Sequence, residues 1–197
     1  MIVFHMSETL KLGDTLDGEY QDKTELISPF VKALEKSTDC FYAMLLNGKY
    51  VRAVMRKSGL REWSNYVKWS VEGAFEYIRK TEFPHCCSRV VCNYFYDSLP
   101  NCKRLFDYDW GEEPDEVRNA IRLYEVELED KCPQRCDMRL FDEAYDAMED
   151  EENLQKVLDL ARRYFAGGCS DEPIWELMSI KPARATKDIS DFLRNER

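Results

Sequence analysis

The chain has 197 residues, of which 44% are hydrophobic and 34% charged, enough apolar material for the core of one soluble globular domain. Its net charge of -10 argues against unaided binding to nucleic acid or to an anionic membrane, because phosphate groups are bound by clustered lysine and arginine. No stretch reaches the roughly 18 apolar residues of a membrane span, and the first residues lack the pattern of a signal peptide. A cytoplasmic location is therefore expected.

The first predicted element is a short strand over residues 2–5, IVFH. Alternation places Val3 and His5 together on one face of this strand. Two turn signals follow, at Gly13–Asp14 and at Asp17–Gly18.

Helices are predicted for much of the next third of the chain. Ser28–Pro29 has the form of a helix start, with serine as the N-cap and proline as the first helical residue. Residues 41–55 favour a helix, although Asn47–Gly48 also fits a hairpin turn. Apolar residues at steps of three or four predict a helix from Trp63 to about Lys80, and Pro84 ends it.

The later part of the chain mixes strand and helix patterns. Residues 88–98 are rich in β-branched and aromatic residues and predict a strand, followed by a short helix or loop over 99–110. Residues 121–129 alternate between apolar residues and glutamates, which is typical of a half-exposed strand. Residues 137–165 predict two helices, and 173–180 a final strand. One α+β domain is the fold that these elements favour.

Eight cysteines occur without a secretory signal, so the sequence raises the question of a zinc site. Residues 132–136, CPQRC, have the spacing of one zinc-ligand pair. Residues 84–87, PHCC, offer three adjacent ligands whose side chains do not easily converge on one ion. Free, partly buried thiols are the alternative, and no metal is assigned.

Common catalytic motifs are absent: the sequence has no G-x-S-x-G, P-loop, G-x-G-x-x-G or H-E-x-x-H pattern. Four short pieces in order nevertheless resemble the ADP-ribosyltransferase fold, in the branch that uses a histidine, an aromatic residue and a glutamate. They are FHMS with the LKLGD turn, PHCCSRVVCNYFYDS, LYEVELE, and YFAGG followed by PIWELMSI. Uncharacterised bacterial and phage proteins of this fold are similar.

The resemblance implies two small mixed β-sheets that form a cleft, with several flanking helices, over residues 1–197. Residues 19–62 match nothing in the family and are expected to be a helical insertion. It implies NAD as the substrate. ADP-ribose would be transferred to a macromolecular acceptor or to water, as in an NAD glycohydrolase. A protein side chain is the expected acceptor, and a nucleic-acid base is the alternative.

The family's site residues carry over onto four positions in particular. The resemblance implies that His5 holds a ribose hydroxyl of NAD and that Tyr94 or Tyr96 stacks on nicotinamide. Glu176 would be the catalytic residue, stabilising the oxocarbenium-like cation. Each has a plainer interpretation: His5 bonding a nearby backbone group, the tyrosines as core aromatics, and Glu176 facing solvent.

Ser88 and Arg89 are also assigned to NAD binding, with Arg89 pairing with phosphate through its planar guanidinium. An ordinary surface ion pair is the alternative for Arg89. Glu72 and Glu76 on the preceding helix are expected to face solvent as partners of Lys and Arg. Ile174 stands two positions before Glu176, where arginine-modifying members carry an acidic or amide residue, so arginine is not favoured as the acceptor.

A function of another class also fits the composition. The acidic runs WGEEPDE and MEDEEN, with the net charge, suit a non-catalytic interaction protein or an inhibitor that imitates nucleic-acid phosphates. Such a mimic requires its acidic runs on one exposed face.

Overall fold

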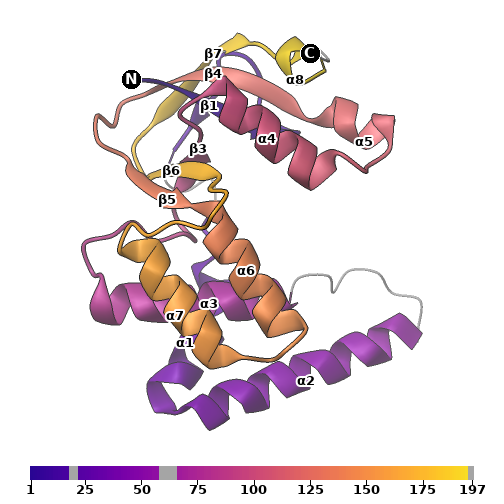
Figure 1. Cartoon of the computed structure of the whole chain (residues 1–197), viewed down its shortest axis with the longest axis vertical. Coiled ribbons are helices and arrows are strands. Elements are labelled where there is room, and N and C mark those ends of the chain that lie inside the picture. Colours follow the sequence, from indigo (N-terminus) through magenta and orange to yellow (C-terminus); the bar gives the residue numbers. More distant parts are fainter. Residues whose placement is uncertain (18–21, 58–65, 195–197) are drawn as a thin grey trace. The chain divides into compact units, whose positions relative to one another are not determined.

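The computed structural model describes residues 1–17, 22–57 and 66–194, and the chain divides into two compact units (Figure 1). Unit 1 comprises Met1–Asp22, Val91–Met138 and Ser170–Arg197, and unit 2 comprises Lys23–Val90 and Arg139–Cys169. Each unit is assembled from segments that are distant in sequence. The expectation of one ADP-ribosyltransferase-like domain with an insertion over 19–62 stays a prediction.

Unit 1 contains two antiparallel sheets. The first has the strand order β1-β4-β7-β2 and the second β3-β6-β5. The strands are β1 (Ile2–Ser7), β2 (Thr15–Leu16), β3 (Asn93–Phe95), β4 (Arg122–Leu128), β5 (Gln134–Asp137), β6 (Trp175–Ser179) and β7 (Ala183–Asp188). The α+β class is confirmed, but the expectation of mixed sheets is wrong, because every strand pair within the described residues is antiparallel. The alternation along β4 already had the form of an antiparallel strand with one solvated face.

Helices α4 (Leu99–Trp110), α5 (Asp115–Ala120) and α8 (Asp191–Arg194) complete unit 1. Two apolar clusters stabilise this unit. One includes Val3 of β1, Phe95 of β3 and Leu177 of β6. The other includes Phe106 of α4 and Leu123 of β4.

Unit 2 is helical. It contains α1 (Thr24–Lys36), α2 (Thr38–Lys57), α3 (Tyr66–Glu82), α7 (Leu154–Phe165) and α6 (Met138–Glu149) from Arg139 onward. Helix α3 packs against both α1 and α7. None of the helices in the described ranges combines the length and the hydropathy that a membrane span requires.

Most of the predicted helices are confirmed, with different starting points. Helix α1 begins at Thr24 instead of Ser28, and Pro29 lies inside it. Burial of Ile27 and Phe30 on this helix offsets the backbone hydrogen bond that proline cannot make. Helix α2 continues through Asn47–Gly48, so the hairpin alternative is wrong.

Three further predictions concern boundaries. The helix expected from Trp63 is confirmed as α3, although Trp63 itself lies outside the described residues. Gly18 of the second turn signal also lies outside them. The strand expected over 88–98 is much shorter, because only Asn93–Phe95 form β3 and residues 89–91 are a turn. The helices over 137–165 and the strand over 173–180 are confirmed as α6, α7 and β6.

Candidate functional site

His5 is buried on β1, and its imidazole is fixed by one hydrogen bond. Nδ1 lies 2.7 Å from the carbonyl oxygen of Tyr94, and the ring centre lies 5.8 Å from that of Phe95. A carbonyl can only accept a hydrogen bond, so Nδ1 carries the proton. In the neutral ring, Nε2 is then left with an unprotonated lone pair that accepts hydrogen bonds.

This hydrogen bond lies where β3 passes from one sheet to the other. The backbones of Phe4 and Tyr96 pair through both possible bonds, at 2.9 and 2.8 Å, which joins β1 to the end of β3. In a continuing antiparallel ladder, the next such pair would be Met6 and Tyr94. The carbonyl of Tyr94 accepts the His5 ring instead. The imidazole therefore bonds to the backbone at the point where β1 and β3 separate.

The buried position of His5 also determines its charge. Desolvation by burial lowers the pKa of His5 below its ordinary value of 6.5, and the hydrogen bond to the Tyr94 carbonyl opposes this only in part. The ring is consequently neutral at neutral pH. The interpretation of His5 as a residue that bonds nearby backbone is confirmed, and its role with NAD stays a prediction.

Glu176 lies on β6 and is only 2% exposed, so the interpretation that it faces solvent is wrong. Tyr94 stands opposite Met178 in the β3–β6 register, and side chains alternate along a strand. Glu176, Met178 and Tyr94 therefore extend from the same face of the sheet. With about 3.3 Å of rise per residue and about 4.8 Å between strands, the Cα atoms of Tyr94 and Glu176 are about 8 Å apart.

The two candidate tyrosines differ in their surroundings. Tyr96 is 8% exposed and belongs to the cluster that includes Leu105 and Phe106 of α4. Tyr94 is half-buried and lies on the face of Glu176. The structure thus places Tyr94 and Glu176 on the same face of one sheet. His5 is linked to Tyr94 only through the Tyr94 carbonyl, and its ring lies beside Phe95, which extends from the opposite face of β3. Tyr96 has the position of a core aromatic.

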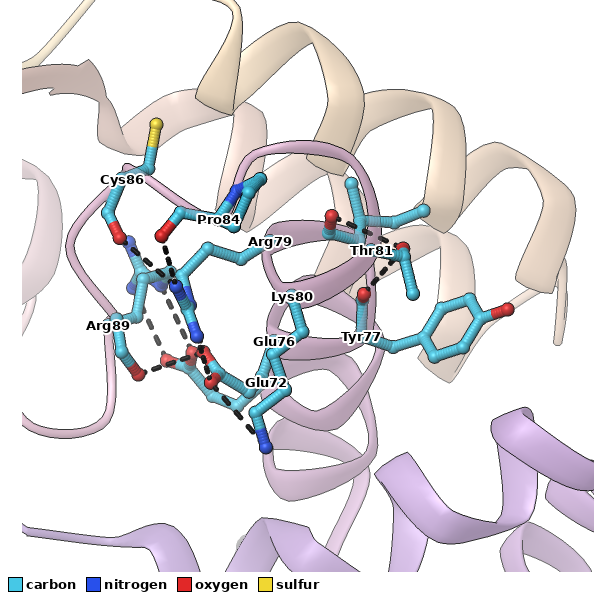
Figure 2. A network of polar contacts seen from close by, with 11 residues as sticks. Glu72, Glu76, Tyr77, Arg79, Lys80, Thr81, Pro84, Cys86 and Arg89 are labelled. Carbon is cyan, nitrogen blue, oxygen red and sulfur yellow. Dashed lines mark hydrogen bonds and ion pairs between the residues drawn. The ribbon is translucent and has the colours of Figure 1, made fainter.

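Ser88 and Arg89 belong to unit 2, where two carboxylates of α3 bind them. Figure 2 shows Arg89 beside Glu72 and Glu76. The hydroxyl of Ser88 donates to Glu76 at 2.8 Å. Arg89 binds Glu72 through two bonds of 3.1 and 3.3 Å. The expected ion pair of Arg89 is confirmed, but its expected position on the surface is wrong, because both partners are buried.

The expectation that Glu72 and Glu76 face solvent is wrong, since they are 5% and 6% exposed. Nε and Nη2 of Arg79 donate hydrogen bonds to the Glu76 carboxylate at 2.8 and 2.9 Å, and Nη1 donates to the carbonyl of Cys86 at 3.2 Å (Figure 2). The segment after α3 therefore folds back over the helix face that carries both glutamates. Helical periodicity alone assigned that face to solvent.

Aromatic side chains enclose the remaining surface of the Arg89 guanidinium. Its Nη1 donates to the hydroxyl of Tyr164 at 2.6 Å, and its Cζ lies 4.1 Å from the ring centre of Phe141. Such an arrangement is typical of a buried structural ion pair, and phosphate binding by Arg89 stays a prediction without support from this geometry.

A family model described as "Protein of unknown function (DUF2441)" matches residues 3–191. The chain belongs to the DUF2441 family. None of the curated proteins matches it. Because the DUF2441 description names no activity, the chemical evidence for function comes from the side chains themselves.

The cysteines of this DUF2441 chain were the sequence's candidate metal ligands. Within the described ranges, no three His, Cys, Asp or Glu side chains are grouped so that they could hold a metal ion. In the CPQRC segment, Cys132 is exposed whereas Cys136 is buried on β5 opposite Glu176.

Sequence reasoning missed one polar residue of this DUF2441 chain beside the candidate site. Asn101, 7% exposed in the first turn of α4, hydrogen-bonds the backbone of Trp175, next to Glu176. Its signal in the sequence is weak, because asparagine is common at helix starts, where it usually serves its own helix.

Proposed function

We propose that this chain cleaves NAD at the nicotinamide–ribose bond and transfers ADP-ribose to a protein side chain, or to water as an NAD glycohydrolase. The observation that carries the proposal is the joint between β1 and β3. There the neutral imidazole of His5 is held by the Tyr94 carbonyl, and the buried carboxylate of Glu176 lies on the neighbouring strand, two positions from the partner of Tyr94.

Each of the three residues has a physical role in such a reaction. With Nδ1 bound to the Tyr94 carbonyl, Nε2 of His5 would accept a hydrogen bond from a ribose hydroxyl and orient the sugar. The ring of Tyr94 would stack on nicotinamide, which is cationic in NAD and is attracted to an aromatic face. A carboxylate in a largely desolvated position, as at Glu176, stabilises positive charge more strongly than one in water.

The bond changes balance without a further reactant. The bond between C1′ of the ribose and the nicotinamide nitrogen breaks, and both electrons leave with neutral nicotinamide. The positive charge then resides on the ribose oxocarbenium beside Glu176. An acceptor hydroxyl, amine, carboxylate or water attacks C1′, and where the acceptor carries a proton, Glu176 accepts it.

Adenine-labelled NAD tests this proposal, with and without a cell extract. We expect label on protein, or free ADP-ribose where water is the acceptor, and at least a ~100-fold lower rate for Glu176→Gln. Glu127→Gln is the matched control, because Glu127 is exposed on β4. Equal rates for wild type and Glu176→Gln would remove Glu176 from the mechanism. Neither turnover nor saturable NAD binding by the wild type would overturn the proposal.

The acidic interaction protein stays the alternative function. Its two acidic runs belong to different units: residues 110–116 follow α4 in unit 1, and residues 148–153 join α6 to α7 in unit 2. Neither unit alone gathers both runs on the single face that a nucleic-acid mimic requires.

A further inference from the structure

Strand β3 pairs with β6 only from Leu177 onward, so within the described residues that side of β6 has no neighbouring strand at Trp175 and Glu176. Phe95 of β3 stands opposite Leu177, so a longer β3 would place Asp97 opposite Trp175. The chain does not continue in this way, because Tyr96 turns to pair with Phe4 of β1. The backbone N–H and C=O of Trp175 on this side therefore need another partner.

The side chain of Asn101 provides it. Nδ2 of Asn101 donates to the carbonyl oxygen of Trp175, and Oδ1 accepts from the Trp175 N–H at 3.3 Å. One primary amide thus makes both hydrogen bonds that a neighbouring strand would make. Asn101 is only 7% exposed and lies on α4. Its hydrogen bonds therefore fix the backbone of Trp175, the residue directly before Glu176, relative to this helix.

A second polar anchor fixes the residues immediately upstream. Asp137, fully buried at the end of β5, accepts the N–H of Ile174 at 3.0 Å through Oδ1. Its Oδ2 accepts both the N–H and the hydroxyl of Ser170, each at 2.7 Å. The start of β6 is consequently held from both sides, by Asp137 toward β5 and by Asn101 on the side that β3 has left.

We infer that Asn101 is a positioning residue for Glu176. Its amide extends the β3–β6 ladder by one pair and so fixes the direction in which the Glu176 carboxylate extends from β6. The consequence for catalysis rests on the proposed function: a displacement of about 1 Å at a charge-stabilising group costs on the order of 100-fold in rate. Ground-state binding of NAD depends on other contacts, including His5, and is expected to change little.

The test compares Asn101→Ala with Leu105→Ala. Leu105 lies on the same helix and is 2% exposed, so its truncation weakens the packing of α4 but leaves both hydrogen bonds between Asn101 and Trp175 in place. For Asn101→Ala we expect kcat for NAD cleavage to fall 10- to 100-fold, with KM within about threefold of wild type. Leu105→Ala should keep kcat within about threefold of wild type despite an equal or larger loss of stability.

A readout without NAD separates this inference from the proposed function. With 13C-labelled glutamate, the side-chain carboxyl signal of Glu176, assigned through Glu176→Gln, should shift in Asn101→Ala and stay in place in Leu105→Ala. An unmoved Glu176 signal, or a full kcat in Asn101→Ala, would overturn the positioning role. If the wild type itself does not cleave NAD, the proposed function fails, and the Glu176 signal still decides whether Asn101 positions the carboxylate.

Discussion

Removal of the negative charge of Glu72 should destabilise unit 2 strongly. In Glu72→Gln the side chain keeps its size, but Arg89, which is buried and 8% exposed, loses the charge of the Glu72 carboxylate. Loss of one partner of a buried ion pair costs about 3–5 kcal/mol. The amide that replaces the carboxylate can still accept one hydrogen bond, and the Arg89 contacts to Tyr164 and Phe141 remain. We therefore expect a loss near the lower end, about 3 kcal/mol.

The chain contains a matched control for this experiment. Arg162 and Glu82 form an ion pair with similar distances, but both side chains are 39% exposed. Exposed pairs contribute at most about 1 kcal/mol, so Glu82→Gln should lower the free energy of unfolding by less than that amount.

Urea denaturation followed by tryptophan fluorescence gives both values, and the slope of the transition should be the same in all variants. A further variant, Glu72→Leu with Arg89→Met, removes both charges and should be more stable than Glu72→Gln. The reasoning would be refuted by equal losses in Glu72→Gln and Glu82→Gln, because burial would then have no energetic consequence.

Three further predictions concern stability. The pKa of His5 is lower in the folded than in the unfolded chain, so the unfolded chain binds the proton first and stability falls as pH drops below about 6.5. The free energy of unfolding of His5→Asn should therefore fall less than that of wild type between pH 7.5 and 5.5. An equal fall in both proteins would contradict the buried neutral ring. Burial alone would raise the pKa of Asp188, but Ser190 and Arg122 lower it to about 2. Asp188→Asn should lower the free energy of unfolding by about 1–2 kcal/mol at pH 7. This difference between the two proteins should vanish as pH falls from about 4 to 2. In Gly73→Ala the new Cβ would lie 2.6 Å from the Cβ of Phe30, so the melting temperature should fall by several degrees, which calorimetry would show.

Elements with a strong pattern of their own could be predicted from the sequence. The alternation of Val3 and His5, and of the buried and exposed residues of β4, depends only on strand geometry and is confirmed. Glu176 could be singled out for a similar reason, because a carboxylate within an apolar strand is unusual. By contrast, β2, β5 and β7 were not predicted, since short or polar strands are determined by their partners in the sheet.

The partners of the buried polar residues could not be predicted. Glu72 and Glu76 lie on α3 where periodicity assigns a solvated face, but the return of residues 83–90 over the helix brings Ser88 and Arg89 onto them, and both are buried. The bond between His5 and Tyr94 likewise joins residues 89 positions apart, and it depends on the separation of two strands. A pattern within a short stretch of sequence predicts neither set of contacts.

The central claim is that Glu176 stabilises the cation formed when nicotinamide leaves NAD. Its most direct test is the rate of nicotinamide release by wild type and Glu176→Gln at saturating NAD, measured by chromatography. We predict release by the wild type and a rate at least ~100-fold lower for Glu176→Gln, with Glu127→Gln close to wild type. Release at the same rate by wild type and Glu176→Gln would contradict the account.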